Sequence, residues 1–254
     1  MFGATGTAGQ AAATALIEAG HHITCVIRPE STGTVAAGAR LHFANVTDAA
    51  SLRDYGFAGE TFDVVVSCIA SRTGAPADAW AIDHDANVSI LEHAKAAGVR
   101  HMVMLSAICV QKPLLDFQHA KLAFEEKLKS SGLEWSIVRP TAFFKSLSGQ
   151  IARVKEGKPY LIFGDGQLTA CKPISDRDLG AFIATCVDAP ERKNCVLPIG
   201  GPGPALTPLE MGREIFRLTD QPEVYRKVPV ALLDVIAGGL RLTGLIKPSL
   251  KVKA

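Results

Sequence analysis

The chain has 254 residues, of which 48% are hydrophobic and 20% are charged, so it can bury a large core and is not a disordered protein. Its net charge is only +2 and no basic run occurs, which argues against nucleic acid as a partner. The six cysteines lack Cys-x-x-Cys spacing, and no histidine has metal-ligand spacing. We therefore expect buried, reduced thiols and no protein-bound metal.

The first 140 residues alternate helix-length segments with apolar runs. Glycine follows three of the expected helices, at Gly20, Gly98 and Gly132, and a strand-like run begins soon after each glycine. Near-continuous apolar runs are typical of parallel strands buried on both faces. The expected helices are residues 10–19, 80–97 and 116–130, and the expected strands are residues 22–29, 64–70, 101–110 and 135–140.

This rhythm predicts an α/β protein with a Rossmann-like, doubly wound parallel sheet. We expect residues 1–145 to bind the cofactor. Residues 146–254 are expected to form a small C-terminal substrate-side lobe integrated with the same domain. In this half, 163–166 reads as a turn, Asp176 is a candidate helix cap, and Thr207 is a candidate cap for the helix that follows it.

The first ten residues, MFGATGTAGQ, carry a G-x-x-G-x-x-G pattern. Glycines let a backbone approach a pyrophosphate, and the following helix offers N–H groups and a partial positive charge. A dinucleotide-binding turn is therefore predicted, and a glycine turn without a ligand is the alternative. The candidate cofactor-binding residues of this turn are Gly3, Thr5, Gly6, Thr7 and Gly9.

The end of the second expected strand selects between the two nicotinamide dinucleotides. An acidic residue there would bind the ribose 2′-hydroxyl of NAD, but this chain has Arg28. A guanidinium pairs well with a 2′-phosphate, which favours NADPH, although Glu30 lies close by. Further cofactor contacts are expected, from position in such a fold, at Asn45, Val46, Ser67, Ala70 and Pro140.

The candidate catalytic residues are Ser106, Phe117 and Lys121. Ser106 is expected to end the strand HMVMLSA, which begins the apolar run 101–110, and the segment FQHAK follows as residues 117–121. This spacing resembles the short-chain dehydrogenase/reductase superfamily, in which Ser and Tyr-x-x-x-Lys lie over the nicotinamide. Phe117 occupies the tyrosine's place and cannot protonate an alkoxide, so alcohol–carbonyl exchange is disfavoured. The resemblance implies that Lys121 bonds the nicotinamide ribose; the alternative is a solvated helix lysine.

Three segments, at 105–125, 136–175 and 197–208, resemble the divinyl (proto)chlorophyllide 8-vinyl reductases, a family in the atypical, NmrA-like branch of that superfamily. The resemblance extends from Gly3 to about Leu233. It implies NADPH-dependent reduction of an 8-vinyl to an 8-ethyl group on divinyl chlorophyllide or protochlorophyllide. The missing tyrosine fits this reaction, because the bond reduced is C=C and not C=O.

Such a substrate is a large flat macrocycle, so the chain needs an apolar wall and a partner for a propionate. Candidate substrate residues are Phe143, Phe144, Lys145 and Lys172, and ordinary core packing is the alternative for each phenylalanine. Leu114 and Leu115 are further wall candidates. The proton donor stays open between Lys121, Cys171 and a bound water.

Members of this family have a full first strand before the glycine turn, whereas only Met1 and Phe2 precede it here. We therefore expect a mis-assigned start or a partial gene, with strand edges left unpaired beside the turn.

Two other functions remain open. An NmrA-like redox sensor would bind NADP without turnover, and an assembly factor of photosynthetic or respiratory complexes would need a contact surface. The stretch 228–246 is the candidate for such a surface or for peripheral membrane contact, since Asp234 and Arg241 interrupt it too often for a membrane span. No signal peptide is visible, so we expect a cytoplasmic protein, peripheral at most to photosynthetic membranes. The oligomeric state is left open.

Overall fold

The computed structural model describes residues 1–229 and 231. The chain divides into two compact units. The first unit combines residues 1–140 with residues 176–199, and the second combines residues 141–175 with the described residues from 200 onward, which are 200–229 and 231. The stretch 228–246, a candidate contact surface, lies almost wholly outside the described residues.

The first unit is built on parallel strands. On one side β1 (Thr24–Ile27) pairs with β2 (Arg40–Phe43), with Cys25 opposite Leu41. On the other side four strands follow in the order β3, β4, β5, β7, and all of their pairings are parallel. Their bounds are β3 (Val64–Ser67), β4 (His101–Leu105), β5 (Glu134–Pro140) and β7 (Cys195–Ile199).

Phe2 joins the two groups of strands. It forms parallel bridges to Val26 of β1 and to Ser67 of β3. The Phe2 N–H donates to the Val66 carbonyl at 2.9 Å, and the Cys68 N–H donates to the Phe2 carbonyl at 3.0 Å. A single residue therefore holds the central position that a full strand occupies in a doubly wound sheet.

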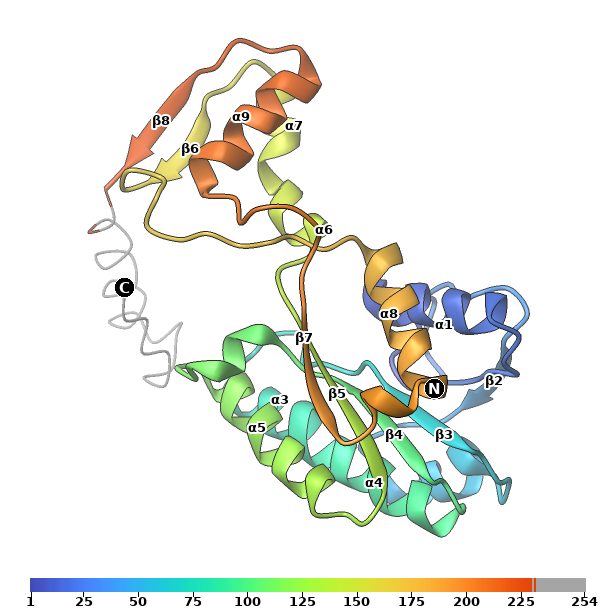
Figure 1. Ribbon diagram of the computed structural model, residues 1–254. Coiled ribbons are helices and arrows are strands. Elements are labelled where there is room, and N and C mark those ends of the chain that lie inside the picture. Colours follow the sequence, from blue (N-terminus) through green and yellow to red (C-terminus); the bar gives the residue numbers. More distant parts are fainter. Residues whose placement is uncertain (230, 232–254) are drawn as a thin grey trace. The chain divides into compact units, whose positions relative to one another are not determined.

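Helices cover both faces of this sheet, as Figure 1 shows. On one face α1 (Thr7–Glu18) packs against α8 (Asp176–Asp188), and on the other lie α4 (Asn87–Ala96) and α5 (Asp116–Lys129). Shorter segments are α2 (Ala49–Ser51), η1 (Leu52–Phe57), α3 (Pro76–Ala79), η2 (Trp80–Ala86), η3 (Ile108–Gln111) and η5 (Pro190–Arg192). The predicted Rossmann-like α/β fold is confirmed.

Residue size explains how closely these layers pack. A Cβ added to Gly180 of α8 would lie 2.5 Å from the Ala11 backbone of α1, so these two helices touch at backbone level. The larger core lies on the other face, where Phe2, Phe124 and Leu128 are among the buried side chains. The small residues at the contact between α1 and α8 thus allow the close approach of these two helices.

Two predicted boundaries differ from the structure. The whole apolar run 101–110 is strand-like in sequence, but β4 ends at Leu105, just before Ser106, which was expected to end this strand, and the 3₁₀ helix η3 takes up residues 108–111. Apolar character continues because Val110 is buried in the turn, so hydrophobicity alone does not mark the strand end. The helix expected at 80–97 starts earlier, at Pro76, and includes the π-helical segment η2.

The second unit has its own small core. Strands β6 (Tyr160–Phe163) and β8 (Tyr225–Val228) pair in parallel, and α7 (Ile151–Lys155) and α9 (Pro208–Thr219) accompany them. Thr207 caps α9 as predicted: its hydroxyl accepts from the Glu210 N–H at 3.3 Å, and the Glu210 carboxylate accepts from the Thr207 N–H at 2.7 Å. The remaining helical turns are α6 (Phe144–Leu147) and η4 (Ser148–Gln150).

A cavity of about 1510 Å³ lies next to Met1 in the first unit. It is lined by the start of β1 and by Val64 and Val66 of β3, together with residues at the beginnings of β4 and β5. The cavity occupies the space between the two strands that Phe2 bridges. Beside the glycine turn, Met1 and Phe2 pair with β1 and β3, so the gap lies at the beginnings of these strands and not at the turn, where unpaired edges were expected.

Candidate functional site

The glycine turn lies where β1, Phe2 and β3 end and α1 begins. Gly3 has φ of +79°, and a Cβ there would lie 2.6 Å from the Cys68 backbone. A Cβ on Gly9 would overlap the Gly3 carbonyl. Both glycines are thus needed for the turn to pack against β3 and α1, whatever it binds.

Gly6 has a different environment. It is the N-cap of α1 with φ of −83°, and an added Cβ would have Gly3 O, at 3.4 Å, as its nearest neighbour. Protein packing does not require glycine here. An open backbone at a helix N-terminus fits a pyrophosphate, and exposed Thr5 and half-buried Thr7 flank it.

Arg28 follows β1 and its side chain is half exposed. Its guanidinium lies 3.7 Å from the Glu30 carboxylate, a loose pair in solvent. Gly33 in the same loop approaches the Thr5 side chain, since a Cβ there would lie 2.7 Å from Thr5 Cβ. The structure therefore brings the loop after Arg28 next to the glycine turn, as the NADPH prediction requires.

The other predicted cofactor residues lie at or after the ends of neighbouring strands. Asn45 is exposed after β2, and its side-chain oxygen accepts from the Thr47 N–H and hydroxyl at 3.1 and 2.8 Å. Ser67 is buried and donates to the Asn87 side-chain oxygen at 2.6 Å. Of the remainder, Val46 packs partly against the core, Ala70 is exposed after β3, and Pro140 is buried at the end of β5.

Lys121 lies in the middle of α5 and is buried. Its Nζ is 2.9 Å from Asp83 Oδ1, and the two side chains are 6% and 0% exposed. The alternative of a solvated helix lysine is therefore wrong. Phe117, one turn earlier on the same face of α5, is half-buried and offers no proton.

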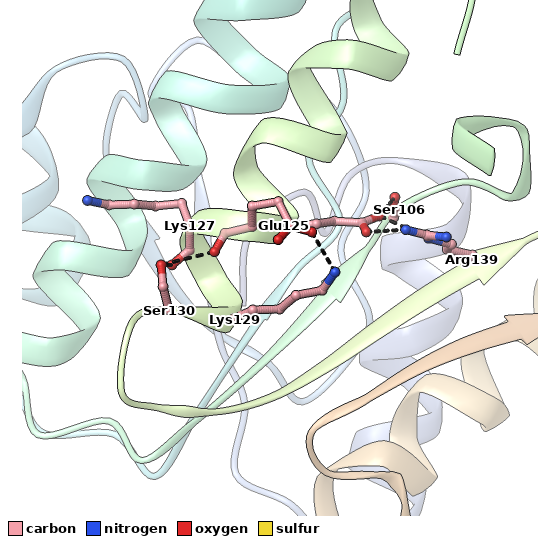
Figure 2. Close-up of polar contacts among 7 residues, drawn as sticks. Ser106, Glu125, Lys127, Lys129, Ser130 and Arg139 are labelled. Carbon is pink, nitrogen blue, oxygen red and sulfur yellow. Dashed lines mark hydrogen bonds and ion pairs between the residues drawn. The ribbon is translucent and has the colours of Figure 1, made fainter. Parts of the chain in front are cut away.

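Ser106 is also buried, directly after β4, and it belongs to a second buried network (Figure 2). Its hydroxyl donates to Glu125 Oε1 at 2.6 Å, and Arg139 forks onto both Glu125 oxygens, with Nε 3.1 Å from Oε1. Glu125 is fully buried. The Ser106 proton is thus held by a carboxylate, which leaves the hydroxyl oxygen as an acceptor.

Sequence reasoning missed Asp83, Glu125 and Arg139. A signal existed for Glu125, because Phe117, Lys121 and Glu125 recur every four residues and so share one helical face. If Lys121 faces inward, Glu125 does as well. Asp83 carries no such signal, because its partner is 38 positions away in the chain.

The predicted substrate residues all belong to the second unit. Phe143 bridges to Ile174, and the Phe144 N–H donates to the Ile174 carbonyl at 3.2 Å, so segments 143–145 and 172–174 lie side by side. Phe143 is half-buried, and Phe144, Lys145 and Lys172 are exposed. Nearby Cys171 is half-buried, and this burial raises the pKa of its thiol.

The cysteines are all free thiols, as expected, but their burial varies. Cys25 and Cys186 are buried, whereas Cys109 is exposed, which corrects the expectation that all are buried. Burial raises the pKa of Cys68, behind Gly3, to about 12. Within residues 1–229 and 231, no group of three metal-binding side chains occurs, and no helix has the length and apolarity to cross a membrane.

Curated relatives share sequence with almost the whole chain. The chain is 46% identical over 269 residues to "Divinyl chlorophyllide a 8-vinyl-reductase, chloroplastic" of Arabidopsis thaliana, covering 98% of this chain and 64% of that protein. The chain thus spans less than two thirds of that relative's length. It is also 23% identical to "Photosystem II assembly factor Ycf39" of Trieres chinensis, covering 93% of this chain and 74% of that one. The resemblance drawn from the sequence motifs is confirmed.

Solved structures confirm the fold. The NADPH complex of quinone oxidoreductase QOR2 from Escherichia coli superposes with a TM-score of 0.74 at 18% identity, covering 96% of this chain and 82% of that one. A family described as NAD(P)H-binding matches residues 3–190, which include the glycine turn, Arg28, Ser106 and Lys121. The chain therefore belongs to this NAD(P)H-binding family.

Proposed function

We propose that this protein uses NADPH to reduce the 8-vinyl group of divinyl chlorophyllide or protochlorophyllide to an 8-ethyl group. The observation that carries the proposal is the 46% identity to a reductase of that name across almost the whole chain. The half-exposed Arg28 directly follows β1, in the loop whose Gly33 lies against Thr5 of the glycine turn, and it supports NADPH over NADH.

The reaction adds two hydrogens across a C=C bond. Bound NADPH would supply the hydride for one vinyl carbon, and a proton would be needed at the other vinyl carbon. The macrocycle spreads the charge that forms between these events, so the chain's main task is to position the reactants. Phe117 in the tyrosine position suits this task, since no alkoxide needs a proton.

Each part of the chain has a role in this proposal. The N-terminus of α1 and Gly6 hold the pyrophosphate, and Lys121 donates to the nicotinamide ribose. Phe143 and Phe144 contact the macrocycle, and Lys145 or Lys172 pairs with its propionate. A bound water is the favoured proton donor, because Lys121 is paired with Asp83 and burial raises the pKa of Cys171.

The test is to incubate the purified chain with NADPH and 3,8-divinyl chlorophyllide and to separate the pigments by chromatography. We expect an 8-ethyl product and an equal amount of NADP⁺. Binding of NADPH without any product would instead favour a redox sensor. Absence of both, with capture on photosynthetic membranes in a flotation assay, would favour an assembly factor.

A further inference from the structure

We propose that Asp83 is the positioning residue for Lys121: it holds the ammonium where the cofactor ribose is bound, and it ties that ammonium to the glycine turn. This inference rests on the proposed use of NADPH. Asp83 lies in η2, far from Lys121 in the chain, and no sequence motif pointed to it.

The pair is enclosed in the protein. Asp83 is fully buried, and the Lys121 side chain is 6% exposed. In the described part of the chain, Nζ has one polar partner, Asp83 Oδ1 at 2.9 Å, although an ammonium has three N–H groups. The pair therefore neutralises the charge but leaves donor capacity for hydroxyl groups of a ligand.

Asp83 is itself held in place from two directions. Its Oδ2 accepts from the Ser71 N–H at 3.3 Å, and its main-chain carbonyl accepts from Asn87 Nδ2 at 3.2 Å. The Asn87 side-chain oxygen in turn accepts from the Ser67 hydroxyl at 2.6 Å. Asp83 is thus fixed to the end of β3.

The same end of β3 supports the glycine turn. Cys68, directly after Ser67, lies against Gly3 and donates its N–H to Phe2. A continuous chain of contacts therefore leads from the turn that would hold the pyrophosphate to the ammonium that would hold the ribose. Both are parts of one ligand, and a fixed distance between them pre-organises the site.

Stability alone does not explain this arrangement. A buried ion pair is weak evidence for stabilisation, because well-packed apolar residues of similar volume are often as good. A positioned ammonium, in contrast, requires both a charge partner and a rigid attachment. The observed contacts provide both.

The test measures NADPH affinity by fluorescence titration, without any pigment, for D83N, K121M and the double variant. Hydrogen bonds to charged groups are strong, so we expect D83N to weaken NADPH binding about tenfold to a hundredfold. In the K121M background D83N should change affinity no further, because Asp83 acts through Lys121. In thermal unfolding the double variant should be more stable than K121M, which leaves a buried carboxylate unpaired.

The control is E134Q, which breaks the 2.8 Å ion pair between Glu134 and Lys193. Glu134 is the first residue of β5, whereas the proposed cofactor residue Pro140 is the last, so E134Q should leave NADPH affinity unchanged. Unchanged affinity in folded D83N overturns the proposal and makes the pair structural. If D83N does not fold, D83E is the variant to measure. Its longer side chain keeps the charge but displaces Lys121 Nζ, so unchanged NADPH affinity in D83E would also overturn the proposal. Wild-type chain that binds no NADPH overturns both proposals, whereas binding without pigment turnover overturns the proposed reaction alone.

Discussion

Gly6 is the glycine of the turn at which the requirement of ligand binding can be tested apart from the requirement of folding. Packing requires glycine at positions 3 and 9, but an added Cβ at Gly6 has no protein atom nearer than 3.4 Å. We predict that G6A costs less than about 1 kcal/mol of stability, the usual scale for an N-cap change from Gly to Ala. The methyl would occupy space needed by a pyrophosphate, so NADPH affinity should fall at least about tenfold, which corresponds to 1.4 kcal/mol.

The matched control for this prediction is G9A. Its methyl would overlap the Gly3 carbonyl, so it should lower the free energy of unfolding by about 1–3 kcal/mol. Urea denaturation and NADPH titration of both variants check the contrast. A G6A protein that binds NADPH as tightly as wild type would contradict the assignment of the turn.

Arg28 carries the second prediction at this scale. R28A should weaken NADPH binding much more than NADH binding, because only NADPH has the 2′-phosphate that a guanidinium pairs with. The partner in the free protein is Glu30, 3.7 Å away, so E30Q should strengthen NADPH binding slightly. Equal losses of both cofactors in R28A would refute the preference.

Residues that belong to a local sequence pattern could be predicted, whereas residues that act on a partner elsewhere in the chain were missed. Gly3, Gly6 and Gly9 follow a local spacing and Lys121 follows a superfamily motif, so all four could be proposed as site residues from the sequence. Asp83 and Arg139 act on α5 from elements distant in sequence, and no local pattern encodes such pairings.

At the scale of elements, two buried ion pairs on one face of α5 connect this helix to the neighbouring elements. Lys121 pairs with Asp83 of η2. Glu125 accepts from Ser106, directly after β4, and pairs with Arg139 near the end of β5. We predict that E125Q lowers the free energy of unfolding by about 3–5 kcal/mol, because it leaves the Arg139 charge buried and unpaired. The neighbouring E126Q breaks only the exposed pair with Lys129 and should cost less than about 1 kcal/mol, as denaturant unfolding would show.

The beginnings of β4 and β5 contain a group that should make stability depend on pH. Ser136 donates its hydroxyl to the Arg192 carbonyl, so His101 Nε2 must donate to Ser136, and its Nδ1 has no partner. Burial lowers the pKa of His101 to about 4. The histidine is therefore neutral in the folded state and charged in the unfolded state at mildly acidic pH.

The sign follows from this difference. The contribution of neutral, buried His101 to the free energy of unfolding is complete above pH 6.5, the pKa of histidine in the unfolded state. It is lost as the pH falls from 6.5 toward about 4, and the total loss is roughly 3 kcal/mol. Unfolding free energies of wild type and H101N at pH 7 and pH 4.5 check this, because the variant should lose about 2–3 kcal/mol less over that interval. Equal losses would assign the acid sensitivity to other groups.

At the scale of the whole molecule, the cavity beside Met1 separates the central strands of the sheet. The Val66 carbonyl accepts from Phe2, and in a strand the N–H of the same residue points to the same side, so β3 presents backbone groups to this space. An extended segment can pair with such an edge and fill the volume with apolar side chains. We therefore predict that five β-branched residues fused ahead of Met1 stabilise the protein by about 2 kcal/mol, or roughly 4–8 °C in Tm.

The pH dependence of this gain in stability shows whether the fused segment pairs with the strands or only makes unspecific apolar contacts. The Met1 amine donates to the Thr24 carbonyl at 2.6 Å, and burial lowers the pKa of the amine to about 6 from an ordinary value of 8. The present chain therefore loses stability as the pH falls from 8 to 6, where the unfolded state binds the proton more readily. The fused chain has a peptide N–H at this position, so its advantage in Tm should be larger at pH 6 than at pH 8.5. A fusion of five glycines and serines replaces the amine but cannot fill the cavity, and it should show the pH effect without the full gain.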